Sequence, residues 1–244
     1  MSRAKSARGS ATTIGYRSDV GRRRGNNEDS YVVRPDLGLY AVADGMGGAG
    51  AGEVASALAL ETLAAAIEAG LGLVAAAERA NRAIVAAAKD GRGANGMGTT
   101  LVALLLRDGA YQLAWVGDSR AYLVDRTLAQ LSRDHSQVQE LVDAGVIGVG
   151  EARLHPQRNI ITRVLGGPDG DRAEVETAHG RLESDQELLL CSDGLHGELE
   201  DDEIAELVTD RRKTAQSRVD ALISAALERG GRDNVTAVLV GTAP

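Results

Sequence analysis

Four aspartates in this chain stand at the ends of short hydrophobic segments, and this limits how the chain can fold. Three of them follow such a segment and the fourth comes just before one: Asp44, Asp118, Asp193 and Asp233. In an antiparallel sheet the end of one strand lies beside the beginning of its neighbour, so these carboxylates can gather at one edge. A lone Asp-Gly pair is usually only a turn, but four aspartates in such positions predict a shared site.

Clustered carboxylates of this kind need a counter-charge, because like charges a few ångströms apart repel each other. The expected ligands are all oxygen atoms, with no set of histidines or cysteines beside them, and such ligands suit Mg²⁺ or Mn²⁺. Gly45 directly follows Asp44. Glycine lets the backbone turn sharply there and leaves its carbonyl oxygen free to act as a further ligand.

The order of the expected helices and strands indicates an α+β fold. Hydrophobic patterning and turn residues predict strands at 30–33, 37–43, 99–106, 111–116, 120–124, 128–131, 173–177, 187–191 and 234–240. Helices are expected at 53–69, 74–88, 136–144, 203–208 and 215–229. Short loops between consecutive strands favour antiparallel pairing. Strands and helices do not alternate strictly, so we expect sheets inside and paired helices outside rather than a doubly wound parallel sheet.

Composition excludes several other classes of protein. Hydrophobic residues make up 43% of the 244 residues and charged residues 25%, which suits a folded globular chain. The net charge of −8 argues against nucleic-acid binding through phosphates, and no apolar run of about 18 residues could span a membrane. The single cysteine, Cys191, favours a reducing, cytoplasmic location. We expect residues 1–11 to be a disordered basic tail and residues 12–244 to be one domain, a monomer.

Seven short motifs in this chain carry a resemblance to a known family. They are Ser18-Asp19-Val20-Gly21 with Arg24 and Asn27-Glu28-Asp29, Asp44-Gly45-Met46-Gly47-Gly48, Met97-Gly98-Thr99-Thr100, Gly117-Asp118-Ser119-Arg120, Asp134-His135-Ser136, Cys191-Ser192-Asp193-Gly194 and Arg232-Asp233-Asn234. In this order and at these spacings the chain resembles the metal-dependent protein serine/threonine phosphatases of type 2C (PPM), in their bacterial branch. The resemblance spans roughly residues 12–241.

The resemblance implies a β-sandwich of two mostly antiparallel sheets flanked by pairs of helices, with two metal ions in the cleft between the sheets. By this resemblance Asp44 bridges the two metals, Asp193 and Asp233 hold the first metal, and the carbonyl of Gly45 holds the second, with Glu28 and Asp29 acting directly or through water. Asp118, with Asp193, matches a third metal position. Arg24 binds the substrate phosphate, and Asn234, like Glu28, stands just outside the ligands. The implied reaction is hydrolysis of phosphoserine and phosphothreonine by direct attack of a metal-bridging hydroxide. The implied partners are phosphorylated proteins and an opposing bacterial serine/threonine kinase.

One departure from the family pattern concerns the proton donor for the leaving group. The family carries a histidine close to the second motif, where this chain has Met46 and Ala49. We do not expect His135 or His155 to replace it, so a metal-bound water would protonate the alkoxide, or alkyl phosphates would react poorly relative to aryl phosphates. The departure keeps open a weakly active or inactive homologue that binds phosphoproteins as a regulator, and a metallophosphatase of small phosphoesters is a third possibility.

Two other motifs are weaker than they look. Residues 45–50 match the glycine pattern of a dinucleotide site, but Asp44 would place a carboxylate beside the pyrophosphate, and one helix leads into another instead of a parallel strand. Cys191 cannot be the nucleophile of a Cys-x₅-Arg loop, because residue 197 is glycine. Segment 134–165, which we call the flap, is glycine-rich and irregular, and we expect it to be a mobile loop that selects substrates.

Overall fold

Two antiparallel sheets form the centre of the molecule. The computed structural model describes residues 12–48, 51–93, 96–167 and 173–242, so the expected tail 1–11 lies outside the described residues. The first sheet has the order β1 (Thr12–Asp19), β11 (Val235–Thr242), β10 (Glu187–Cys191), β7 (Arg120–Val124), β8 (Leu128–Gln130). The second has the order β2 (Asp29–Arg34), β3 (Leu39–Met46), β5 (Leu101–Arg107), β6 (Ala110–Val116), β9 (Glu176–Arg181), with β4 (Gly98–Thr99) pairing with β3.

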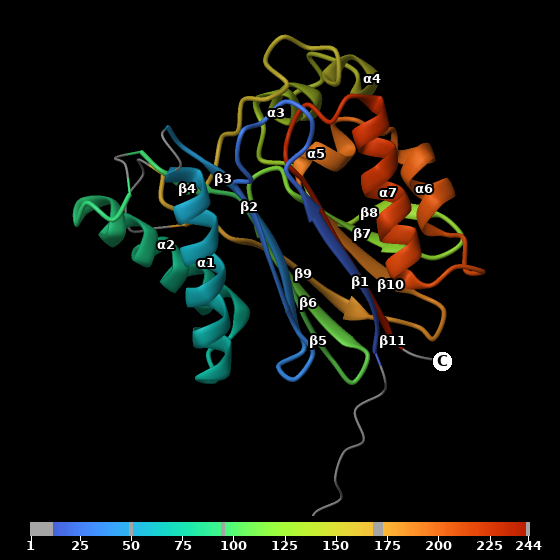
Figure 1. The fold of residues 1–244 in the computed structure, drawn as a ribbon, viewed down its shortest axis with the longest axis horizontal. Helices are drawn as coiled ribbons and strands as arrows, with labels where there is room; N and C mark the ends of the chain where they lie inside the picture. The colour runs from blue at the N-terminus through green and yellow to red at the C-terminus, as the bar shows by residue number, and fades with distance from the viewer. Residues whose placement is uncertain (1–11, 49–50, 94–95, 168–172, 243–244) are drawn as a thin grey trace, which may run out of the picture.

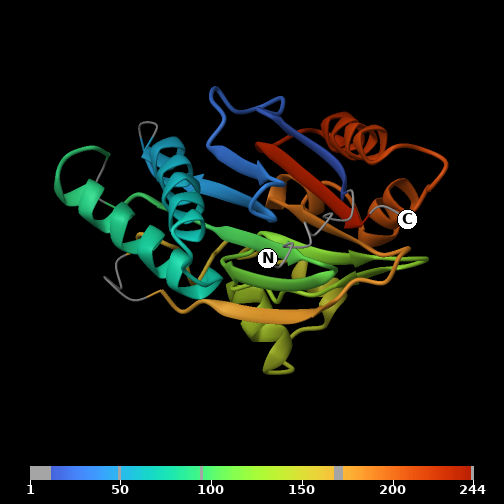
Figure 2. The same ribbon diagram turned by 90° about the horizontal axis from the view of Figure 1, so that it is seen from below.

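Helices cover the outer face of each sheet, as Figures 1 and 2 show. Helices α1 (Ala51–Glu68) and α2 (Leu73–Lys89) lie against the second sheet, and α6 (Asp201–Val208) and α7 (Ala215–Arg229) against the first. The short helix α5 (Asp193–His196) follows β10, while α3 (Gln137–Asp143) and α4 (Val149–Ala152) lie in the flap. None of the helices in the described ranges is both long enough and apolar enough to cross a membrane.

Three layers of buried side chains hold this sandwich together. The central layer, between the sheets, contains Val42, Leu104, Trp115 and Val238, and the two outer layers join each sheet to its helices. Helix α1 is rich in alanine on its buried face, which lets it pack closely against the sheet. The buried layers follow directly from the apolar patterning of the strands, since burying apolar surface is the main favourable contribution to folding.

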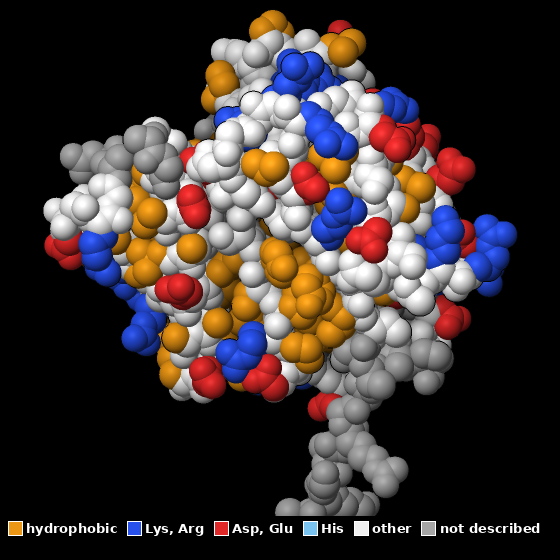
Figure 3. All heavy atoms as spheres, in the orientation of Figure 1, with side chains coloured by type: hydrophobic (Ala, Val, Ile, Leu, Met, Phe, Trp, Pro, Cys, Tyr) orange, Lys and Arg blue, Asp and Glu red, His pale blue; other side chains and the backbone are white. Residues whose placement is uncertain are grey.

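The central layer reaches the surface between the edge strands β1 and β2. Tyr16 and Tyr31 are 42% and 40% exposed there, and their ring centroids lie 5.4 Å apart. Figure 3 shows the resulting hydrophobic patch over the region between these strands. Gln216 of α7 accepts from the backbone N–H of Tyr16 and donates to its carbonyl oxygen. This side chain therefore covers part of the open edge of β1, which would otherwise be free to pair with another strand.

The predicted α+β sandwich is confirmed, but two strands differ from expectation. Residues 12–19 form a strand that the pattern did not predict, because the segment is largely polar and lies at a sheet edge, paired only with β11. The strand expected at 173–177 is wrong in position, because β9 runs over residues 176–181. It too is an edge strand, and its side chains are exposed or only half-buried, so its hydrophobic signal is weak.

Candidate active site

The structure brings the predicted aspartates together at one end of the sandwich. Asp29 on β2 is the direct register partner of Asp44 on β3. Burial raises the pKa of Asp44 well above its ordinary value, and repulsion from Asp29, Asp193 and Asp118 adds to this effect. Such mutual repulsion requires the carboxylates to be close neighbours. In Figure 1 the β1–β2 loop, the flap and α5 meet at this same, upper end.

Three of these carboxylates have a buried oxygen that nothing in the described part of the chain satisfies. These atoms are Oδ1 of Asp29, of Asp118 and of Asp193. A buried carboxylate oxygen without a donor is strongly unfavourable, so such groups point to a cation. Among the described residues no three acidic, histidine or cysteine side chains converge tightly enough to hold an ion as they stand. The oxygen donors therefore fit a hard divalent ion in kind, but as they stand they do not form a complete set of ligands.

Burial is the main cause of the unusual ionisation of this cluster. It raises the pKa of Asp29 to about 7, with repulsion from Asp193 and Asp233 acting in the same direction. It raises the pKa of Asp193 to about 6, where repulsion from Asp233 adds to it and a hydrogen bond with Asp44 opposes it. The pKa of Asp118 also rises well above its ordinary value through burial and repulsion from Asp193. Strongly perturbed acids gathered at one place are typical of a functional site.

Two hydroxyl groups from the first sheet hold Asp29 in place. Ser192 Oγ and Thr236 Oγ1 each donate to Asp29 Oδ2 at 2.7 Å. Asp29 begins a strand of the second sheet, so this contact joins the two sheets beside the cluster. One oxygen of Asp29 is therefore engaged and the other remains available. The sequence analysis missed both hydroxyl residues, although Ser192 directly precedes Asp193.

The Met97–Thr100 motif positions the backbone of Asp44. Thr99 Oγ1 donates to the Asp44 carbonyl oxygen at 2.9 Å, and the N–H of Asp44 donates to Thr100 Oγ1 at 3.0 Å. Thr100 Oγ1 also lies 2.7 Å from Ser119 Oγ, next to Asp118. These two threonines thus connect two of the predicted ligands, a role that the motif alone did not reveal.

Gly45 is packed too closely against Gly52 for any larger side chain. A Cβ on Gly45 would lie 2.0 Å from the Gly52 carbonyl oxygen at the start of α1. The N–H of Gly45 donates to the carbonyl of Glu28 at 3.1 Å, and the Glu28 carboxyl lies close to Gly52 as well. Glu28 is therefore beside Gly45, where the predicted second metal position would be.

The Asp118 loop is held by two buried histidines. The N–H of Gly117 donates to His135 Nδ1 at 3.0 Å, and the N–H of His135 donates back to the Gly117 carbonyl at 3.0 Å. His196 Nε2 lies 3.1 Å from the Asp118 carbonyl oxygen and donates to it. Burial lowers the pKa of both imidazoles, so both are neutral near pH 7. His155, the other histidine weighed as a proton donor, lies within the flap, where its Nδ1 accepts from the N–H of Gln157.

Asn234 organises the loop that carries Arg24. Its Oδ1 accepts from the N–H of Glu28 at 2.8 Å, and its Nδ2 donates to the carbonyls of Val20 and Asn26, each at 2.9 Å. Arg24 is half-exposed, and its Nη2 donates to Asp233 Oδ2 at 2.6 Å. The guanidinium group therefore faces the carboxylate cluster. Of the two positions where the family histidine is missing, Met46 is the last residue of β3, two positions after Asp44, and Ala49 lies outside the described residues.

Comparison with known proteins agrees with this geometry. The sequence profile of the family named Protein phosphatase 2C matches residues 22–232. This chain belongs to the protein phosphatase 2C family. The family predicted from the motifs is thus confirmed.

Individual relatives cover nearly the whole chain. The serine/threonine phosphatase stp of Listeria monocytogenes is 39% identical in an alignment 239 residues long that covers 92% of this chain and 94% of that protein. The crystal structure of the serine/threonine phosphatase PstP/Ppp of Mycobacterium tuberculosis superposes with a TM-score of 0.87 and 39% identity, over 96% of this chain and 99% of that one. A structure of the PstP catalytic domain in complex with two manganese ions superposes with a TM-score of 0.84 and 37% identity, over 96% and 100%.

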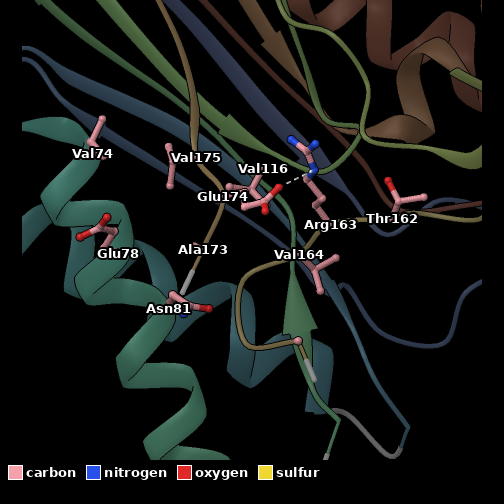
Figure 4. A pocket seen from close by; sticks show the side chains of 11 residues that line it. Val74, Glu78, Asn81, Val116, Thr162, Arg163, Val164, Ala173, Glu174 and Val175 are labelled. Carbon is pink, nitrogen blue, oxygen red and sulfur yellow. Dashed lines mark ion pairs between the residues drawn. The ribbon is translucent and has the colours of Figure 1, made fainter. Parts of the chain in front are cut away.

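Two of the cavities in the described part of the chain bear on the location of the reaction, and of these two only one is lined by members of the cluster. The smaller cavity, about 120 Å³, is lined by Asp118, Asp193 and His196 on one side and by flap residues on the other. The larger, about 640 Å³, lies between α2 and residues 162–167 and 173–175 (Figure 4). Its charged lining includes an ion pair between Arg163 and Glu174 but none of the clustered aspartates. Of these two cavities, the smaller one therefore adjoins the carboxylate cluster.

Proposed function

We propose that this chain hydrolyses phosphoserine and phosphothreonine in proteins and requires Mn²⁺ or Mg²⁺ for this activity. The observation that supports the proposal is the set of buried carboxylate oxygens that have no partner among the described residues, next to an arginine that faces them. Relatives over most of the chain carry the name serine/threonine phosphatase. The chain would accordingly be a phosphoric monoester hydrolase.

The residues that would hold two ions are the clustered aspartates and the carbonyl of Gly45 at this edge. Asp44 would bridge the ions, Asp193 and Asp233 would hold one of them, and the Gly45 carbonyl with Asp29 would hold the other. Asp118, whose Oδ1 is also unpartnered among the described residues, would join Asp193 at a third position. When bound, such ions would activate a water molecule near neutral pH and offset the charge of the phosphate.

Arg24 would bind and orient the phosphate group. In the described part of the chain its guanidinium makes one hydrogen bond, to Asp233, and its remaining N–H donors are free for phosphate oxygens. A planar guanidinium suits two phosphate oxygens at once and stabilises the charge that develops in the transition state. Asn234 would act indirectly by holding the loop that positions Arg24.

The leaving group would receive little help from protein side chains. His135 and His196 are neutral and already hold backbone groups, so neither is suited to donate a proton. We therefore expect aryl phosphates, whose leaving groups need less protonation, to react faster than phosphothreonine peptides. A purely phosphoprotein-binding regulator is not favoured, because a binding module gains nothing from buried unpaired charge.

The cellular setting follows from the substrate. A phosphatase of this kind needs a kinase that forms phosphoserine and phosphothreonine, and we infer a bacterial serine/threonine kinase acting in the same cytoplasm. We further propose that the chain acts as a monomer.

Phosphate release from a phosphothreonine peptide tests the proposed function. Purified protein is assayed with Mn²⁺, with an EDTA blank, and beside Asp193→Asn and the surface control Asp210→Asn. We expect release that depends on metal, falls by about 100-fold or more in Asp193→Asn, and survives in Asp210→Asn. Folded protein with bound metal that released no phosphate from the peptide would contradict the proposal.

A further inference from the structure

One flap side chain, Arg153, makes three polar contacts with the body of the protein. Its Nη1 donates to the carbonyl oxygen of His196 at 2.9 Å and its Nη2 to that of Leu199 at 3.2 Å. Its Nε lies 2.9 Å from Glu200 Oε1. The planar guanidinium thus engages the end of α5 and the residue just before α6 at the same time, which a flexible ammonium group cannot reproduce.

The outer part of the flap has little else to fix it. Of the side chains in residues 144–159, all of which the structure describes, only Arg153 forms a hydrogen bond or ion pair with a residue outside the flap. Val146, Val149 and Leu154 are 66%, 77% and 86% exposed, so apolar packing does not anchor this segment. Figure 3 shows separate hydrophobic side chains at the top of the molecule, where α3 and α4 lie in Figure 1. Segments with so few buried contacts open easily.

The contacts of Arg153 lead directly to the predicted ligands. The helix it reaches, α5, begins at Asp193, and the imidazole of His196 in that helix donates to the carbonyl of Asp118. The cavity of about 120 Å³ lies between these residues and the flap, and Arg153 contributes to its wall. The position of the outer part of the flap, residues 144–159, over the cavity therefore depends on this one side chain.

We propose that Arg153 is a positioning residue that straps the flap to α5 and thereby sets the affinity for phosphoprotein substrates, while leaving the chemical step unaffected. The proposal rests on the proposed function. A polypeptide that enters the site must lie against the flap, whereas a small aryl phosphate needs only the carboxylate edge and Arg24. A flap that is already fixed spares the substrate the loss of entropy that ordering it would require.

Steady-state kinetics with two substrates tests this division. The variants are Arg153→Gln, which removes all three contacts, and Arg153→Lys, which can keep the ion pair with Glu200 but cannot engage both carbonyls. Arg212→Gln, an exposed arginine that pairs only with Asp210, is the matched control. If the flap is correctly placed for only about a tenth of the time without its strap, KM for a phosphothreonine peptide rises about tenfold in Arg153→Gln.

The other kinetic constants distinguish a strap from a general structural role. We expect kcat for the peptide, and kcat/KM for p-nitrophenyl phosphate, to stay within about twofold of wild type. Arg153→Lys should fall between wild type and Arg153→Gln in peptide KM, and Arg212→Gln should match wild type. An unchanged peptide KM in Arg153→Gln, or equal losses with both substrates, would overturn the proposal.

Hydrogen exchange supplies a readout that needs no activity. Amides of residues 141–152 should exchange faster in Arg153→Gln than in wild type, with and without Mn²⁺, while those of β10 and β11 should not change. If wild-type protein failed to act on the peptide, the proposed function would fail, and exchange would still decide whether the strap exists. Unchanged exchange in the flap would refute the strap itself.

Discussion

Replacing Asp193 with asparagine should make the protein more stable once metal ions have been removed, although it should abolish activity. The carboxylate of Asp193 has a buried oxygen without a partner among the described residues, and it lies beside Asp233 and Asp44. Asparagine has nearly the same shape but no charge. The substitution therefore relieves both the burial of the charge and its repulsion by neighbours.

The size of the effect follows from the ionisation of the carboxyl group. Its pKa rises from an ordinary 3.8 to about 6, and each pKa unit corresponds to about 1.4 kcal/mol, so the ionised group disfavours the folded state by about 3 kcal/mol near neutral pH. The amide does not recover all of this, because Asp193 begins α5 and a negative charge at a helix start contributes up to about 1 kcal/mol. A gain of about 2 kcal/mol in the free energy of unfolding, or about 4–8 °C in Tm, is expected.

The gain should depend on pH with a definite sign. A group whose pKa is raised in the folded state contributes stability below its unfolded pKa and loses that contribution as pH rises through the folded pKa. For Asp193 this window runs from about 4 to about 6. The asparagine variant should therefore match wild type near pH 4 and exceed it increasingly up to about pH 7.

Thermal unfolding followed by circular dichroism in EDTA, at several pH values, measures this effect. Asp210→Asn is the matched control, because a hydrogen bond from Arg212 lowers the pKa of Asp210 to about 2 and its charge is already compensated. That variant should not gain stability. Mn²⁺ should raise Tm in wild type more than in Asp193→Asn, because binding to the folded state alone stabilises it. A lower or unchanged Tm for Asp193→Asn in EDTA at neutral pH would refute the reasoning.

Three further predictions concern other parts of the molecule. Arg24→Gln should lower kcat/KM for p-nitrophenyl phosphate by about 100-fold, and Arg24→Lys should lower it less, because the charge remains but the fork is lost; equal activity of all three proteins would exclude phosphate binding by this residue. Arg218→Met should reduce the free energy of unfolding, measured in urea, by about 3 kcal/mol, because the buried carboxylate of Glu187 loses its main partner. Adding Glu187→Gln should restore most of this loss. If it does not, the buried charge is not the cause of the destabilisation. Gly194→Ala should destabilise the folded protein by about 3 kcal/mol or more, because the new Cβ would lie 1.9 Å from the Asn234 carbonyl oxygen. Gly72→Ala is the control, because a Cβ there meets no neighbouring atom. An equal Tm for the two variants would contradict the close packing at Gly194.

Much of the fold was predictable because its signals are local. The Ala- and Leu-rich periodicity of α1 and α2 and the hydrophobic runs of β3, β6 and β10 are readable over a few residues. The edge strands β1 and β9 escaped prediction because each pairs on one side only and keeps a polar pattern. Where burial is weak, the sequence carries little information about pairing.

The gathering of the aspartates at one edge was predictable from the sequence, whereas the contacts that support them were not. The aspartates were found because each stands at the end of a strand. Two of the supporting residues, Ser192 and His135, lie in the motifs, but nothing near them in the chain indicates that they contact Asp29 and Gly117. The contacts of Thr236 and His196 carried no local signal either. The pairing of Arg24 with Asp233 likewise joins residues 209 positions apart.

The amino-acid sequence alone therefore determined the family, the oxygen-rich set of clustered carboxylates and most of the order of strands and helices, because these depend on residue types and their spacing. Tertiary structure decided which groups meet: that Thr236 donates to Asp29 across 207 positions, and that Arg153 reaches α5. Such contacts arise when the two sheets and the flap pack together, and no local pattern encodes them, since the free energy that selects them comes from the burial of the whole core.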